Sequence, residues 1–281
     1  MFAALLLSST MQARTFDEII ESNKLLVSVY RDFPPFSSIV EGQPVGIDID
    51  IARAIAKGLG IELVLRWTTA DENVEDDLRN NLWKGDFYHK KKSDLMLRIP
   101  YDKAYSQLRD DIGELVHDRV HMFAPYHTEI WQVAFNSKRL ESVPTVAVFQ
   151  YHDIGVEVDS VPAFYFTGAF RGTMTKHTKH FPTIALAAEA MFNQQVDAIM
   201  GMRSQVTALV ANQPEHFKLA SNGFPTIGRQ QWDIGMAVKS ENRQLSYAIG
   251  DVVTELVNSG KLKAIFERHH AHYQKPEYYQ P

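Results

Sequence analysis

The chain has 281 residues, of which 45% are hydrophobic, and a formal charge of -5 from 29 basic and 34 acidic residues. This length suits one large domain or two lobes with separate cores, and the acidic balance argues against a nucleic-acid partner. The chain contains no cysteine. Disulfides, thiolate metal sites and cysteine nucleophiles are therefore excluded.

The N-terminus carries a short apolar run, residues 2–7, followed by small and polar residues that end at Ala13. This pattern is typical of the end of a secretory signal peptide. We expect residues 1–13 to be its remnant, with cleavage after Ala13 and a mature protein in the periplasm. The alternative is an ordinary frayed terminus. No other apolar run approaches the roughly 20 residues of a membrane span.

The first half of the chain alternates between strand and helix patterns. A double proline at Pro34 and Pro35 ends the first strand, and Gly60 ends the first long helix, whose apolar residues recur at helical spacing. The order predicts an α/β fold with a mostly parallel sheet. The expected elements are a strand at residues 25–30, a helix at 49–60, a strand at 61–67, a helix at 71–83 and a strand at 94–99.

The second half repeats this alternation without repeating the sequence, and it shows no fixed internal period. An alanine-rich stretch predicts one helix, and Gly260 predicts a break in the closing helical region. The expected elements are strands at residues 145–149, 198–202 and 234–238, and helices at 183–193, 204–212 and 244–266, the last as one helix or two.

The opening of the chain, residues 25–61, resembles the periplasmic solute-binding proteins of amino-acid-type ABC transporters, family 3. The matching positions are residues 27–29, Asp32, residues 34–36, Gly42, residues 45–46, residues 48–50 and residues 52–60. Further family-like phrases occur at residues 123–126, 195–200 and 260–266. The resemblance implies a two-lobed type II periplasmic binding protein fold, in which each lobe is a mostly parallel sheet flanked by helices. It also implies a ligand cleft between the lobes.

In that family the chain crosses between the lobes twice. The crossings fall here near residues 128–136 and 228–234. The resemblance therefore predicts a first lobe from residues 14–127 and 233–281, and a second lobe from residues 128–232.

The positions that recognise an α-amino acid in that family carry different residue types here. Val116 stands where an arginine binds the carboxylate, although Arg109 or Arg119 could take that role. Met202 stands where an acidic residue binds the ammonium. The small residue and threonine after the third strand are replaced by Arg98 and Tyr101, and residues 149–153 stand where a glycine-threonine loop is expected. A charged ligand group without its partner is costly to bury. We therefore expect the fold without standard α-amino-acid recognition.

Several residues are candidates for contact with a small-molecule ligand. Arginines and polar groups at the ends of strands suit such contacts, because open α/β sheets bind ligands at the carboxyl ends of their strands. For each residue the alternative is an ordinary packing or surface role. The candidate ligand-binding residues are Phe33, Arg98, Tyr101, Asp102, Tyr151, His152, Asp153 and Arg203.

A histidine cluster ends the closing helix, and His269 and His272 could share a helical face. No third ligand has a suitable spacing, so we predict no metal site and no cofactor. The chain has no G-x-S-x-G, P-loop, G-x-G-x-x-G or H-E-x-x-H motif. We therefore expect no enzymatic activity; the alternative is an enzyme such as a dehydratase on the same scaffold.

Two functions remain open. The first is a periplasmic receptor that binds a small polar solute, other than a standard α-amino acid, and delivers it to an ABC permease. The second follows from phrases such as residues 71–80, 82–85 and 93–102, which resemble the branch associated with PQQ-dependent quinoprotein dehydrogenases. It is an accessory protein of a periplasmic alcohol or methanol dehydrogenase or its cytochrome. In either role we expect a monomer.

Overall fold

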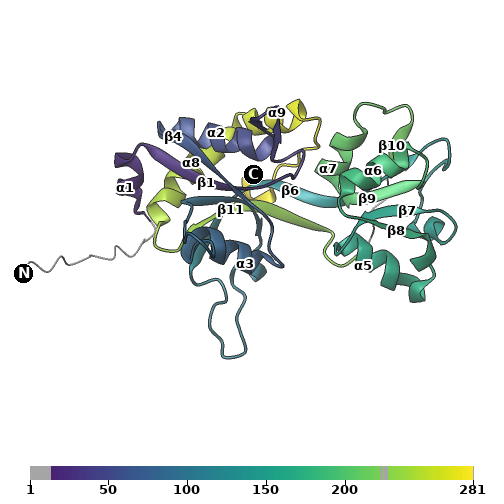
Figure 1. Ribbon diagram of the computed structural model, residues 1–281, viewed down its shortest axis with the longest axis horizontal. Coiled ribbons are helices and arrows are strands. Elements are labelled where there is room, and N and C mark those ends of the chain that lie inside the picture. Colours follow the sequence, from purple (N-terminus) through teal and green to yellow (C-terminus); the bar gives the residue numbers. More distant parts are fainter. Residues whose placement is uncertain (1–13, 222–223, 225–226, 281) are drawn as a thin grey trace, which may run out of the picture. The chain divides into compact units, whose positions relative to one another are not determined.

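The computed structural model describes residues 14–221, 224 and 227–280 (Figure 1). The predicted signal sequence lies outside these residues. The chain forms two compact units. Unit 1 comprises residues 14–32, Asp48–Ala124 and Gly235–Glu255. Unit 2 comprises Phe33–Ile47, Pro125–Ile234 and Leu256–Pro281.

The sheet of unit 1 is built on β1 (Lys24–Tyr30). This strand pairs in parallel with β4 (Glu62–Thr68) along its whole length and with β5 (Leu95–Tyr101) at Val27 and Ser28. The part of β11 (Gln231–Lys239) that lies in unit 1 follows β5 in the strand order. The predicted first, second and third strands are thus confirmed, and they pair in parallel as expected.

Helices cover both faces of this sheet (Figure 1). On one face lie α2 (Ile47–Leu59) and α8 (Arg243–Asn258), packed so closely that a Cβ on Gly58 would overlap Val252. On the other face α3 (Val74–Leu78) and the π-helical turn η1 (Arg79–Trp83) bury Leu78 and Leu82 against β5. The predicted helix at residues 71–83 is therefore two shorter pieces.

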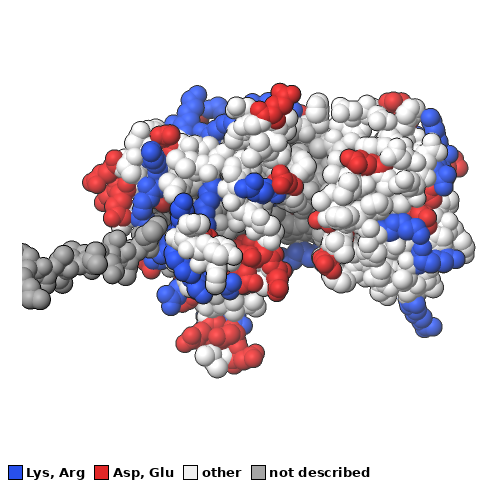
Figure 2. Space-filling model, viewed as in Figure 1, with Lys and Arg blue, Asp and Glu red and all other residues white. Residues whose placement is uncertain are grey.

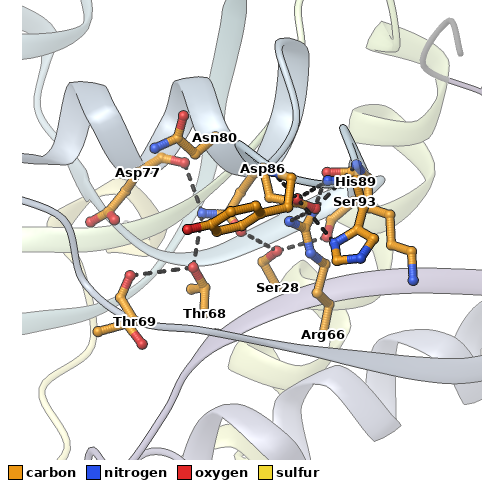
Figure 3. A network of polar contacts seen from close by, with 12 residues as sticks. Ser28, Arg66, Thr68, Thr69, Asp77, Asn80, Asp86, His89 and Ser93 are labelled. Carbon is orange, nitrogen blue, oxygen red and sulfur yellow. Dashed lines mark hydrogen bonds and ion pairs between the residues drawn. The ribbon is translucent and has the colours of Figure 1, made fainter.

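A buried polar network explains the wide turn at η1 (Figure 3). Ser28 on β1 donates to the side-chain oxygen of Asn81 at 2.9 Å and lies 2.7 Å from the hydroxyl of Ser93. The Asn81 amide donates to the backbone oxygen of Asp77 at 2.8 Å and to Thr68 Oγ1 at 3.3 Å. Because buried polar groups need partners, this network fixes η1 against two strands at once.

The sheet of unit 2 follows the order β6-β9-β7-β8. The long strand β6 (Val120–Asn136) runs antiparallel to β9 (Ala198–Met202), and β7 (Ile154–Glu157) runs parallel to both β9 and β8 (Thr178–Phe181). The short β10 (Phe217–Leu219) pairs with β6. Helices α6 (Ile184–Phe192) and α7 (Arg203–Val210) pack on one face, and α5 (Val161–Gly168) packs on the other.

The predicted strand at residues 145–149 is wrong. The structure has a 3-10 helix there, η2 (Val146–Gln150), which the Thr145 side chain caps by accepting from the Ala147 N–H at 3.3 Å. Val146 and Phe149, three residues apart, are buried on the same side of this turn. The first strand of the unit 2 sheet after β6 is instead β7, which was not predicted from the sequence.

The remaining predicted elements of the second half are confirmed with small shifts, and the closing region is two helices separated at Gly260. The described elements not yet named are α1 (Phe16–Glu21), β2 (Ser38–Val40), β3 (Gln43–Val45), α4 (Lys103–Ser106), η3 (Ala169–Gly172), η4 (Thr175–His177), α9 (Lys261–Arg268) and η5 (Glu277–Tyr279).

The first predicted lobe crossing lies within β6 and the second overlaps the start of β11; these are two strands that have residues in both units. The compact units differ from the predicted lobes in two long segments and, by two or three residues each, at residues 125–127 and 233–234. Phe33–Ile47 and Leu256–Pro281 group with unit 2 here, whereas the prediction assigned them to the first lobe. The lobe boundaries stay a prediction.

Both signs of charge occur on the face drawn in Figure 2, and a small acidic group marks the tip of the loop that projects beyond α3. No helix among the described residues is both long and apolar enough to cross a lipid bilayer.

Candidate functional site

The carboxyl ends of β7, β8 and β9 meet at one edge of the unit 2 sheet, because the three strands are parallel. Each strand passes there into a helix: β7 into α5 through residues 158–160, β8 into α6 through residues 182–183, and β9 directly into α7. Open α/β sheets bind ligands at such an edge. We call this set of strand ends and helix starts the carboxyl edge of unit 2.

The turn between β7 and α5 is a tight one. Asp159 adopts a left-handed conformation with φ +56°, and its side chain is exposed. Ser160 follows as the cap of α5: its hydroxyl accepts from the Ala163 N–H at 3.3 Å and donates to the Glu157 carbonyl at 2.6 Å. This turn occupies the place after the first strand where a glycine-threonine loop was expected, so the assignment of that loop to residues 149–153 was wrong.

Two helix starts at this edge are already occupied by the protein's own carboxylates. Glu157 accepts from the Ile184 N–H at the start of α6 at 3.1 Å, and its pKa is raised by burial. Glu129 accepts from the Ser204 N–H at 3.2 Å at the start of α7, and also from the Ser204 hydroxyl. Negative groups suit helix starts. These two carboxylates therefore satisfy backbone N–H groups in the first turns of α6 and α7.

An aromatic and thioether surface lies beside the start of α7. Trp131 on β6 is directly opposite Met202, the last residue of β9, so both side chains point to the α5 face of the sheet. The Trp131 ring packs on Trp232 with a centroid distance of 4.8 Å, and its indole N–H donates to the Arg229 carbonyl at 2.9 Å. Both tryptophans are half-buried. Such rings provide flat apolar contact area for a ligand.

Arg203 supplies positive charge at the same edge. It is the first residue of α7, and its Nε is buried without a hydrogen bond to any of the described residues. Burial and, next in size, the positive charge of Arg203 lower the pKa of His272 to about 4, so the guanidinium acts on the imidazole electrostatically. An arginine beside a helix start can bind a carboxylate or another acceptor group.

Tyr151, His152 and Asp153 lie at the opposite edge, before β7 begins. The Tyr151 side chain is 79% exposed. His152 Nδ1 lies 3.1 Å from Asp197 Oδ2, and the Asp153 N–H donates to the same oxygen at 3.1 Å. The Asp153 carboxylate accepts from His177 Nδ1 at 2.6 Å. These contacts join the amino ends of β7, β8 and β9, so the three residues do not share an edge with Arg203.

Arg98 is buried inside unit 1. Its Nη1 lies 3.7 Å from Asp48 Oδ1, with side-chain exposures of 4% and 1%. The residue has φ +60°, a left-handed conformation within β5. Nearby, Tyr30 donates to Asp77 Oδ2 at 2.7 Å, and burial raises the pKa of both groups. The arginine is therefore part of a buried polar cluster; ligand contact by Arg98 stays a prediction.

The other three predicted residues have local roles in the structure. Asp102 caps α4, where its carboxylate accepts from the Ala104 and Tyr105 N–H groups at 2.6 and 3.1 Å. Tyr101 packs against the Leu78 cluster of unit 1. Phe33, in unit 2, contacts the Phe36 ring at 5.2 Å. Ligand contact by these residues also stays a prediction.

Of the eight predicted residues, Arg203 alone lies at the carboxyl edge of unit 2. Tyr151, His152 and Asp153 lie at the other end of the strands, because β7 was not recognised. Four residues at this edge were not predicted from the sequence: Trp131, Trp232, Asp159 and Ser160. A signal for the last two was available: the short apolar run of residues 154–156 is followed, after Glu157 and Val158, by a polar pair and a helix with Pro162 near its start. The tryptophans carried no local signal, because the strand pairing brings them together.

The described residues contain no group of three or more histidines, aspartates or glutamates arranged to hold a metal ion. The helix α9 ends at Arg268, so His269 and His272 do not lie on one helical face.

Comparisons with known proteins support the fold. Residues 25–84 match the family described as bacterial extracellular solute-binding proteins, family 3. An ancestral cationic amino acid solute-binding protein superposes with a TM-score of 0.69 at 16% identity, covering 90% of this chain and 98% of that one. The substrate-binding protein AbpA from Streptococcus pneumoniae, solved with L-arginine, gives 0.62 at 22% identity, covering 90% and 97%.

A curated relative, the cyclohexadienyl dehydratase of Pseudomonas aeruginosa, is 38% identical over 80 residues. This match covers 26% of the chain and spans 30% of the length of that relative.

The resemblance expected from the opening of the chain is thus confirmed: the protein has the α/β fold of the two-lobed periplasmic binding proteins and, over residues 25–84, the sequence pattern of the family 3 extracellular solute-binding proteins.

Proposed function

We propose that this protein is a periplasmic solute receptor of the amino-acid transporter type. In this proposal it binds a small solute at the carboxyl edge of unit 2 and delivers it to an ABC permease. The family match over residues 25–84 and the solute-binding fold support a receptor. The position of the edge supports the site, because three strand ends and three helix starts converge there.

The observation that carries the choice of solute is the pairing of Met202 with Trp131. An α-amino acid brings an ammonium group that needs an anion, and a thioether beside an indole ring provides none. In addition, Asp159 places a negative charge in the turn that the solute-binding relatives are expected to use for a carboxylate. An ammonium group is therefore unfavourable beside Met202, and a carboxylate is favoured at Arg203 and not in the Asp159 turn.

The solute that fits better has an acceptor group for Arg203 and a flat apolar part for the two tryptophans. A small organic carboxylate without an α-amine has this chemistry. Arginine favours carboxylates because its planar fork can donate two parallel hydrogen bonds. We propose this class in place of the standard α-amino acids.

In this proposal the protein binds its solute and does not catalyse a reaction on it. The dehydratase match is partial, and the buried carboxylates at this edge, Glu129 and Glu157, already accept from backbone N–H groups. An accessory role beside a quinoprotein dehydrogenase stays a prediction that no relative described above supports.

A thermal-shift panel tests the proposal. It would contain the standard amino acids, their deaminated carboxylates, small amines and sugars. A ligand at about 100 times its dissociation constant adds about 2.7 kcal/mol, or a few degrees in a chain of this size. Stabilisation by a carboxylate supports the proposal. A panel without any stabilising solute contradicts a receptor role, and dehydration of a cyclohexadienyl compound would establish an enzyme instead.

A further inference from the structure

A second surface lies in unit 1, far in the sequence from the carboxyl edge of unit 2. It is the loop of residues 85–92, which follows η1 and which we call the Phe87 loop. Phe87 and Tyr88 are 80% and 84% exposed, the highest values among the exposed large aromatic side chains of the described residues. Adjacent and largely exposed aromatic rings are costly to leave in water unless they serve a contact.

The Phe87 loop is braced from inside. The Asp86 carboxylate accepts from the backbone N–H groups of Tyr88, His89 and Lys91 at 3.1, 2.6 and 3.1 Å. Arg66, on β4, reaches the same carboxylate at 3.2 Å and the Lys91 carbonyl at 2.5 Å (Figure 3). Gly85 has φ +85°, and a Cβ there would overlap the Lys90 carbonyl. The loop is therefore held in one conformation by its own polar contacts.

This bracing presents the aromatic pair outward with positive charge beside it. The two rings meet edge to face at a centroid distance of 5.3 Å, and Lys90 Nζ lies 5.3 Å from the centre of the Phe87 ring. Lys90 and Lys91 are exposed. Residues 84–92 contain four lysines and one aspartate, a net charge of +3 from 4 minus 1, in a chain whose net charge is -5.

Aromatic rings flanked by lysines have the chemistry of an interfacial membrane contact. The rings enter the headgroup region, and lysine side chains keep their ammonium groups among anionic headgroups. A protein partner fits less well for two reasons. Two aromatic side chains bury about 300–500 Å², whereas a stable interface needs roughly 800 Å² on each partner. Lysine is also depleted at protein interfaces.

We propose that the Phe87 loop is a weak membrane-docking element that binds the surface of an anionic lipid bilayer. The two aromatic rings insert between headgroups, and Lys90 and Lys91 bind the negative lipids. This docking keeps the protein at the membrane surface, and it does not depend on which solute the protein carries.

Vesicle co-sedimentation of the full chain tests the proposal. One vesicle set contains phosphatidylcholine alone, and the other contains equal parts phosphatidylcholine and phosphatidylglycerol. The parent protein should bind the anionic vesicles, and raising the salt from about 0.1 M to about 1 M should weaken this binding, because the Debye length falls from about 10 to about 3 Å.

Two pairs of variants localise the binding. F87S/Y88S should lower partitioning at least about tenfold, whereas F164S/Y247S, which removes two other exposed aromatic rings, should not. K90E/K91E should also lower it at least about tenfold, since each lysine near an anionic surface contributes about fivefold. K57E/K176E makes the same change in net charge at exposed sites elsewhere and should have little effect.

Circular dichroism melts confirm that each variant is folded. All variants keep the same N-terminus, so any contribution of residues 1–13 is constant. Equal partitioning of F87S/Y88S and its control would overturn the proposal, as would binding that ignores phosphatidylglycerol. It would also be overturned if the parent bound no vesicles, even if the loop were then found to bind an acidic protein.

Discussion

Trp131 on β6 lies directly opposite Met202, the last residue of β9, and both side chains share the α5 face of the unit 2 sheet. The pairing places a ring and a thioether at the strand end where an amino-acid receptor needs an acidic group. Because Arg203 follows immediately as the first residue of α7, the same short segment combines an apolar wall with a cation. This combination underlies the first two predictions.

Met202→Asp should restore an anion for an ammonium group. We expect this variant to bind an α-amino acid about tenfold better, relative to the matching carboxylate without the amine, than the parent does, because an ammonium gains an ion pair. Isothermal titration calorimetry of both solutes measures the ratio. Met202→Asn, which is similar in size but uncharged, is the control. An equal gain in both variants would show that charge at this position is not the cause.

Arg203→Gln should weaken carboxylate binding by about ten- to a hundredfold, since a hydrogen bond to a charged group is worth about 1.5–3 kcal/mol. Titration of the carboxylate that stabilises the parent measures the loss. Arg53→Gln removes an exposed arginine that pairs with Asp50 in unit 1 and should bind like the parent. If Arg203→Gln also bound like the parent, Arg203 would have no part in the site.

Glu129→Gln should destabilise the protein by about 2–4 kcal/mol. The carboxylate is fully buried, accepts from both the backbone and the hydroxyl of Ser204, and lies 3.3 Å from His127 Nε2. His127 Nδ1 in turn accepts from the Gln274 N–H at 3.3 Å, so the group joins β6, the start of α7 and the C-terminal segment.

Urea unfolding measures this effect, with Glu141→Gln at an exposed position as the control. A loss below about 0.5 kcal/mol for Glu129→Gln, similar to an ordinary surface change, would mean that the network contributes little to stability.

His272 should make the protein less stable in acid. Burial, followed by the charge of Arg203, lowers the pKa of His272 from 6.5 to about 4. The unfolded chain therefore binds a proton between about pH 6.5 and pH 4 that the folded chain does not, so stability is full above this window and falls as the pH decreases through it. After allowance for solvent screening the contribution is about 1 kcal/mol.

Urea midpoints at pH 7.5 and pH 4.5 test this prediction. His272→Gln should lose less stability between the two pH values than the parent, whereas His180→Gln, at an exposed site, should not differ from it. In addition, Arg203→Gln should raise the His272 pKa, which NMR titration of the imidazole can follow. An unchanged pKa would show that the two side chains are not coupled.

Much of the fold could be predicted from the sequence, because the relevant patterns are local. The strand before Pro34 and the helix that ends at Gly60 are set by residues within each element, and both are found where expected. The error at residues 145–149 has a physical cause: the same apolar residues suit a strand or a 3-10 turn, and the Thr145 cap favours the turn. That error moved the expected loop from residues 158–160 to residues 149–153.

The site was predicted less well because it depends on strand pairing. Arg203 could be identified from its place after an apolar strand, but the contact of Trp131 with Trp232 joins residues about 100 positions apart and has no local signal. Arg98 also follows an apolar run, yet its ion pair with Asp48 is a tertiary contact. An arginine at a strand end therefore does not by itself show that the side chain faces a ligand.

The central claim is that the carboxyl edge of unit 2 binds a solute without recognising an α-ammonium group. Its most direct test is calorimetry of the parent protein with matched pairs of solutes, each pair being an α-amino acid and the same carboxylate without the amine. Aromatic, branched and short members should be included. We expect at least one carboxylate to bind as tightly as its amino acid or more tightly. Tenfold tighter binding of the amino acid in every pair would contradict the claim.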